Sequence, residues 1–277
     1  MALDYVELMR GSAAGVFAAC MRAMDEAAAS GQLREANQAA SDVLGGALVG
    51  PLDFDEIRSF GEQLRLSDDP IRISTGLAAI LAADVAQGVD PTSTERSWRS
   101  VAEGNGLVWL GAVHGAHIAG LELESGAFEA AERRVWDARQ TVVAMGDVWY
   151  LNAMNPILAF AVDGQGRTNE FLRIADQYEA QMTMFDREAR IQRHVLRARA
   201  LRHRGRLDDA EVAARTGLEL VESTDLLPTR AAVLTELSIV LAARGFGREA
   251  ASYEESAIEV YRKKGNLAAI AKFTLNR

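Results

Sequence analysis

The stretch Gly205-Arg-Leu-Asp-Asp-Ala210 places a glycine directly before an alanine-rich amphipathic segment. The same arrangement recurs at Gly31-Gln-Leu-Arg-Glu-Ala36, Gly126-Ala-Phe-Glu-Ala-Ala131 and Gly245-Phe-Gly-Arg-Glu-Ala250. Weaker turns at Gly88 and Gly166 fill the gaps, so the glycines at 88, 126, 166, 205 and 245 are 38, 40, 39 and 40 residues apart. A fixed period of this length is typical of repeat proteins, in which each unit buries one face against the next.

Each repeat is expected to form two antiparallel helices joined at its glycine, because glycine ends a helix in the left-handed conformation at little cost. On both sides of Gly245, apolar and small residues recur at the helical spacing and not at the alternating spacing of a strand. The composition agrees, since helix formers are abundant and the chain has only five prolines. We therefore predict an all-α protein.

The predicted architecture is an α-solenoid of about six helix pairs with a period near 39 residues, forming one elongated domain over 1–277. The first pair is expected at 12–44, followed by an irregular connection at 45–67 that holds at most one short helix. Regular pairs are expected at 69–103, 106–145, 147–182, 185–222 and 227–264. A last helix at 266–275 is expected to cap the open end of the array.

Composition excludes several classes of protein. Of the 277 residues 49% are hydrophobic, which is enough for a packed core, and the net charge of -9 argues against direct binding of nucleic acid. Cys20 is the only cysteine and cannot form an internal disulfide, so we expect a cytoplasmic protein. The most apolar windows are about half of the roughly 20 residues that cross a bilayer, which indicates no membrane partner.

A resemblance to the tetratricopeptide repeat follows from these residues. Gly205, Leu207 and Ala210 follow Ala198 at the spacing of that motif, and Gly126, Phe128 and Ala131 follow Ala119 in the same way. The period departs from the family's shorter repeat, and Gly88 and Gly166 lack the full pattern. The long repeat looks like the C-terminal helical arrays of bacterial, especially actinobacterial, LuxR-type transcription activators and cyclase-associated signalling ATPases. The resemblance implies a binding module with a concave groove lined by the first helix of each pair.

An arginine-rich helix stands out in this acidic chain. Arg190, Arg193 and Arg197 share one face of the helix expected at its centre. Two interpretations remain open. Either acidic residues of neighbouring helices, such as Asp176 and Glu179, pair with these arginines, or the face binds carboxylates of an acidic partner segment.

The two preceding first helices carry other candidate binding residues. Trp149 could anchor a bound peptide while Asn152 and Asn155 hydrogen-bond its backbone, although aromatic residues of this kind are more often part of the core. His114 and His117 are interpreted as core or groove-lining residues, because a metal site would need a third ligand that their helix face does not offer.

The helix that holds these histidines is unusually thin, because Gly111, Ala112, Gly115, Ala119 and Gly120 lie along it. Close packing against another helix is the favoured explanation, and room for a ligand beside the helix is the alternative.

The residues assemble no catalytic site, so we expect neither enzyme activity nor a metal or cofactor. We predict a binding module for a protein or peptide with an acidic segment, in signalling or transcription regulation. The alternative is a ligand sensor that encloses a small molecule or a signalling peptide. Tyr253 and Tyr261 near the C-terminus would suit a homodimer contact.

Overall fold

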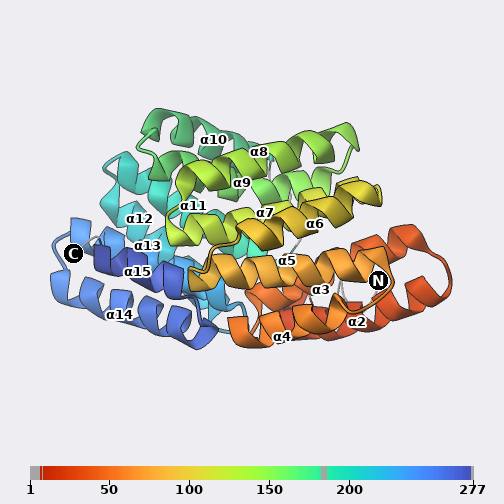
Figure 1. The fold of residues 1–277 in the computed structure, drawn as a ribbon. Coiled ribbons are helices and arrows are strands. Elements are labelled where there is room, and N and C mark those ends of the chain that lie inside the picture. Colours follow the sequence, from red (N-terminus) through yellow and green to blue (C-terminus); the bar gives the residue numbers. More distant parts are fainter. Residues whose placement is uncertain (1–6, 8, 182–185, 276–277) are drawn as a thin grey trace.

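The computed structural model describes residue 7 and residues 9–181 and 186–275, and in these the chain is all-helical without a strand. The helices, labelled as in Figure 1, are α2 (Ala13–Ala29), α3 (Leu33–Val49), α4 (Phe54–Leu64), α5 (Pro70–Gln87), α6 (Thr92–Gly104), α7 (Val108–Ser125), α8 (Phe128–Ala144), α9 (Val148–Gly164), α10 (Thr168–Gln181), α11 (Arg187–His203), α12 (Leu207–Val221), α13 (Leu227–Ala243), α14 (Gly247–Lys264) and α15 (Leu267–Leu275). The prediction of an all-α protein is confirmed. None of these helices is long and apolar enough to cross a membrane.

The glycines that end the helices follow a shorter period than the sequence predicted. Gly106, Gly126, Gly146 and Gly166 all have positive φ and lie 20 residues apart, so successive helices, and not only successive pairs, end on a left-handed glycine. The left-handed glycines at 205, 245 and 265 continue the series at intervals of 39, 40 and 20 residues. A residue with a Cβ atom would be strained in this conformation, which explains why glycine stands at each of these turns.

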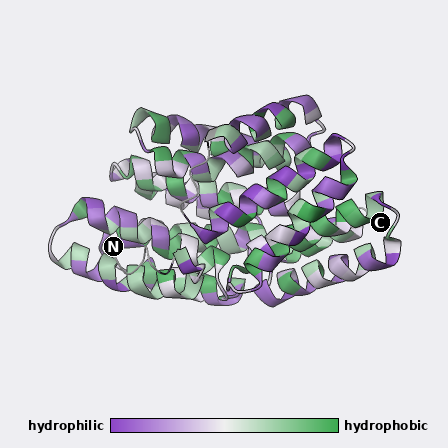
Figure 2. Ribbon diagram, turned by 180° about the vertical axis from the view of Figure 1, so that it is seen from behind, coloured by the Kyte–Doolittle hydropathy of each residue, from purple (hydrophilic) through white to green (hydrophobic). Residues whose placement is uncertain are grey.

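The middle of the chain forms two layers. The first helices α7, α9, α11 and α13 contact one another in order, and the second helices α8, α10 and α12 each pack between two of them. Hydrophobic residues gather where helices pack and hydrophilic residues lie outside, so the helices in Figure 2 carry both colours. Alanine is frequent in the buried positions, which brings neighbouring helices close together.

The stretch expected to be irregular is mostly helical, because α3 continues to Val49 and α4 follows within it. Helix α4 packs closely on α5 where Gly61 faces Gly76, and a Cβ atom at either glycine would lie 2.6 Å from the carbonyl oxygen of the other. Asp53 and Glu56 form a capping box at the start of α4. The insertion of this helix explains why the turn glycines Gly31 and Gly88 are 57 residues apart, against 38 to 40 residues in the later pairs.

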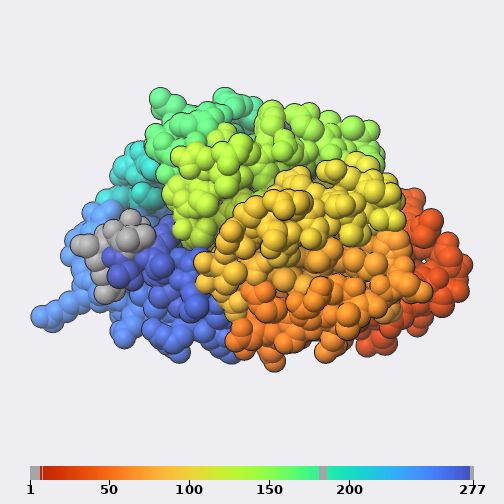
Figure 3. Space-filling model, viewed as in Figure 1, coloured from red at the N-terminus to blue at the C-terminus, as the bar shows by residue number. Residues whose placement is uncertain are grey.

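The N-terminal helices contact helices of the C-terminal part. The carboxylate of Asp225 accepts hydrogen bonds from the backbone N–H groups of Ala13 and Ala14 at the start of α2, at 2.6 and 3.0 Å. Helix α3 contacts α7 and α13, and α15 contacts α5 and α7 as well as α14. In Figure 3 the orange part of the chain, which holds α4 and α5, adjoins the C-terminal part, in blue. The last helix therefore reaches back to the middle of the chain, where the sequence analysis expected it only to cap an open end.

Candidate functional site

Two of the three arginines on the predicted face of α11 pair with a carboxylate of the chain itself. Arg193 donates two hydrogen bonds to the carboxylate of Glu179 on α10, at 3.0 and 2.6 Å, and Arg197 lies 4.0 Å from the same carboxylate. The hydrogen bond from Arg193 holds the pKa of Glu179 below its usual range. Arg190 is exposed. Of the two interpretations, the structure favours internal pairing, because α10 supplies the carboxylate that the sequence analysis named.

Other arginines of α11 turn toward the inner layer. Arg199 and Arg202 each hydrogen-bond the carboxylate of Glu236 on α13, at 2.7 and 3.0 Å, and Glu236 is fully buried. Burial alone would raise the pKa of Glu236, but the two arginines outweigh it and the pKa lies below its usual range. The sequence analysis missed this cluster. Its only signal is a glutamate among the apolar residues of α13.

The structure does not bring the expected peptide-binding residues of α9 together with the arginines. Asn155 accepts a hydrogen bond from Arg139 on α8, so its side-chain oxygen is already engaged. Asn152 is half-buried and Trp149 is 37% exposed. Asn155 thus lies beside α8, whereas the arginine face lies beside α10.

The two histidines of α7 are core residues. His114 is fully buried, and His117 packs against Gly45 of α3, where a Cβ atom would lie 3.2 Å from its imidazole. Burial lowers the pKa of His114 to about 3, with His117 adding to the effect, and burial lowers the pKa of His117 to about 4. The described residues contain no group of three side chains that could hold a metal ion. Both histidines are therefore neutral at physiological pH.

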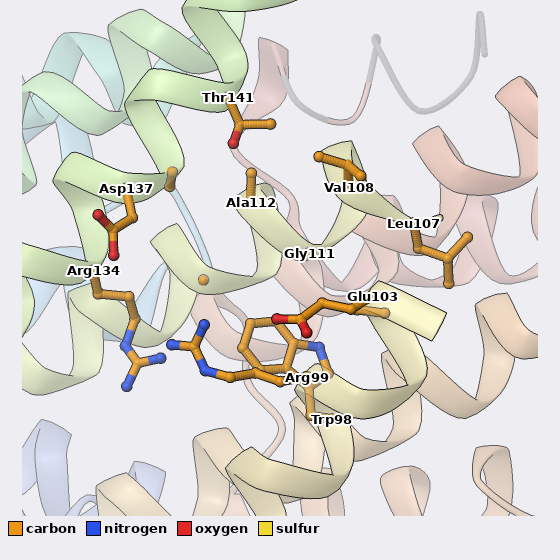
Figure 4. Close-up of a pocket in the computed structure, with 13 residues that line it drawn as sticks. Trp98, Arg99, Glu103, Leu107, Val108, Gly111, Ala112, Arg134, Asp137 and Thr141 are labelled. Atoms are coloured by element: carbon orange, nitrogen blue, oxygen red, sulfur yellow. The ribbon is translucent and has the colours of Figure 1, made fainter. Parts of the chain in front are cut away.

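The glycine-rich face of α7 forms the floor of a cleft between α6 and α8. The cleft has a volume of about 220 Å³ and is shown in Figure 4. A Cβ atom at Gly111 would meet only Ala102, at 3.5 Å, and one at Gly115 would have Arg134 and Trp98 no nearer than 3.8 Å. Neither position therefore needs glycine for close helix packing, the explanation favoured from the sequence. The geometry at Gly111 favours the alternative, room beside the helix.

One end of the cleft holds a closed ion network. Arg134 of α8 hydrogen-bonds Glu95 at 2.9 Å and Glu122 at 2.7 Å, and Arg99 hydrogen-bonds Glu95 at 2.8 Å. Burial alone would raise the pKa of Glu95, but the arginines outweigh it and lower the pKa. Two arginines thus face two carboxylates, and this end carries no net charge.

The walls of the cleft differ from this neutral end. Glu103 on α6 and Asp137 on α8 line the cleft, are exposed, and take part in no hydrogen bond or ion pair of their side chains with the described residues. Trp98 is buried, and its indole N–H has no acceptor within the described part of the chain. Small and apolar side chains complete the lining, among them Ala102, Leu107, Val108, Ala112 and Ala138. The cleft therefore combines an apolar floor with an unsatisfied donor and unpaired negative charge.

The opposite, inner side of α7 is partly covered by the chain itself. The ammonium group of Lys264 at the end of α14 donates hydrogen bonds to the carbonyl oxygens of Ala47 and Gly50 at the end of α3, both at 2.8 Å. Asn266 donates to Glu124 of α7 at 2.7 Å. Burial lowers the pKa of Lys264 to about 7 and raises that of Glu124 to about 7. These contacts hold α15 against the surface where a concave groove was expected.

No model of a known protein family matches the chain, and no curated protein matches it either.

Proposed function

We propose that the chain is a tetratricopeptide-like α-solenoid of six helix pairs that binds a segment of another protein. Support for the repeat comes from the left-handed glycines at 88, 126, 166, 205 and 245, each at the turn between the two helices of a predicted pair. Further support comes from the two-layer packing of α7 to α13. The resemblance to regulatory arrays suggests a place in bacterial signalling or transcription regulation.

The observation that carries the binding role is the open cleft over Gly111 and Gly115. Glycines on a helix face normally let a neighbouring helix approach closely, but a Cβ atom at Gly111 or Gly115 would meet its neighbours only at 3.5 Å or more, so this face does not require glycine for packing. An exposed hollow with an apolar floor and a few polar groups is the usual form of a recognition site. The proposed binding surface is thus the outer cleft, in place of the inner groove that the resemblance implies.

The size of the cleft favours one anchoring side chain over an enclosed ligand. Sites for drug-sized molecules occupy roughly 300–1,000 Å³, whereas this cleft has about 220 Å³. A cavity of about 150 Å³ accommodates benzene, so one side chain of a partner fits well. The alternative function, a sensor that encloses a small molecule or a signalling peptide, is the weaker candidate on this ground.

The test uses two glycines on opposite faces of α7. Peptides are first selected from a random library for binding to the native protein, and their affinities for G111L and G120L are then measured. A leucine side chain at position 111 would fill the cleft, while position 120 faces the inner side, where a Cβ atom has nothing within 4 Å. Both changes replace a helical glycine by a better helix former, so both variants should fold.

Loss of binding in G111L with retention in G120L supports the outer cleft. The reverse result would return the binding site to the inner face and overturn the proposal for the cleft. Peptides that bind both variants as well as the native protein would show that α7 takes no part, which also refutes it.

A further inference from the structure

We propose that the cleft between α6 and α8 recognises a positively charged side chain, arginine or lysine, of an extended partner segment. This inference rests on the proposed function and specifies the partner. It differs from the acidic partner expected from the arginine-rich helix.

The charged side chains that line the cleft, together with their ion-pair partners, carry a net negative charge. Every arginine at the cleft already has a carboxylate, because Arg99 and Arg134 are hydrogen-bonded to Glu95 and Glu122. Glu103 and Asp137 have no such partner among the described residues. Together with Glu95 and Glu122 they make four carboxylates at the cleft, and only two arginines balance them. The cleft therefore attracts a cation and repels an anion.

The two unpaired carboxylates lie on either side of an apolar floor. Figure 4 places Glu103 and Asp137 on opposite walls, with Gly111 and Ala112 between them. Arginine and lysine have long aliphatic stems that bury against apolar surface while the charged head stays near water. The stem of such a side chain fits the apolar floor, and its head then lies among the carboxylates of the rim.

The indole of Trp98 lies at the wall of the cleft and can report on what fills it. The residue is 4% exposed, and its indole nitrogen is covered and finds no acceptor in the described part of the chain. A ligand therefore does not bond this nitrogen directly, but a ligand that fills the cleft changes its surroundings.

Two of the three predicted arginines of α11 are already held by a carboxylate, and Arg190 is exposed. Arg193 and Arg197 share Glu179, and Arg204 is held at 2.8 Å by both carboxylate oxygens of Asp176. An acidic segment would have to displace these carboxylates, whereas a basic segment in the cleft displaces nothing.

The experiment follows the indole N–H resonance of Trp98 by NMR during titration with blocked tripeptides that carry one central residue between alanines. The resonance is assigned by its loss in W98F. The central residue is arginine, lysine, glutamate or citrulline, which has the shape of arginine without its charge. The arginine and lysine peptides should shift the resonance, and the citrulline peptide should bind about tenfold more weakly, because a hydrogen bond to a charged group contributes about 1.5 kcal/mol or more.

Matched variants separate a local site from general attraction to an acidic protein. The double variant E103Q/D137N should weaken binding of the arginine peptide about tenfold. The control E222Q/E255Q removes the same charge from two exposed positions outside the cleft, one directly after α12 and one on α14, and should change the affinity by less than about twofold. Equal loss in both double variants, or equal affinity for the arginine and citrulline peptides, would overturn the basic anchor.

The outcomes distinguish this inference from the proposed function. If the glutamate or citrulline peptide shifts the Trp98 resonance as strongly as the arginine peptide, the cleft binds peptides but the charge preference is wrong. If none of the four peptides shifts it, both the charge preference and the use of the cleft are refuted.

Discussion

Replacing His117 by leucine should reduce the amount by which the free energy of unfolding falls as the pH is lowered from 6.5 to about 4. The folded chain keeps this imidazole neutral, because burial lowers its pKa from 6.5 to about 4. In the unfolded chain it takes up a proton as the pH falls below 6.5, while in the folded chain it does not until about pH 4. The unfolded state thus binds more protons in this window, and the contribution of the neutral imidazole to stability is lost as the pH falls from 6.5 to about 4.

The size of the effect follows from the two pKa values. One pKa unit corresponds to about 1.36 kcal/mol, and linkage then gives a loss of about 2 kcal/mol in the free energy of unfolding between about pH 7 and pH 5. His117→Leu removes this contribution and leaves that of His114. At neutral pH the variant should lie within about 1.5 kcal/mol of the native protein, since leucine is similar in size and needs no hydrogen-bond partner.

The assay is urea unfolding of both proteins at several pH values, and the quantity of interest is the difference between the two curves. Other groups act in the same window: burial raises the pKa of Glu124 and Glu188 to about 7, which lowers stability as the pH rises from 4.5 to about 7. Both proteins contain these glutamates, so subtracting one stability curve from the other removes their contribution. A difference that stays constant from neutral pH to about pH 5 would refute the reasoning. An NMR titration of the native His117 imidazole with a midpoint near 6.5, the ordinary value, would refute it independently of the variant.

Two further changes test the packing. Lys264→Met leaves carbonyl oxygens at the end of α3 without a donor, so the free energy of unfolding should fall by about 3 kcal/mol and amide exchange in α15 should accelerate. The exposed control Lys263→Met should change the free energy of unfolding by less than about 0.5 kcal/mol. Equal stability of the two variants in urea would contradict this prediction. Gly164→Ala puts a methyl group into the ring of Phe128 and should lower the melting temperature through a loss of about 1–3 kcal/mol. Gly120→Ala, with nothing within 4 Å, should raise it through a gain of about 0.5–1 kcal/mol, and a lower melting temperature for Gly120→Ala would count against the open inner side.

Local sequence information determined the helices of this protein. Apolar spacing and left-handed glycines act within a single turn of chain, so the helices after residue 69 begin and end within a few residues of their predicted bounds. The same local rules allowed a short helix between the first pair and the rest, but they could not show how it packs, because the contact of Gly61 with Gly76 joins two separate helices.

The partners of the side chains were decided only by the tertiary structure. Arg190, Arg193 and Arg197 share a helix face in any helix, but whether that face meets solvent or Glu179 depends on the angle at which α10 packs. The glycines of α7 were visible in the sequence, yet they are equally compatible with close packing and with an open space. The distance between α6 and α8 decides between the two, and that distance is set by side chains far apart in the sequence, such as Glu95 and Arg134.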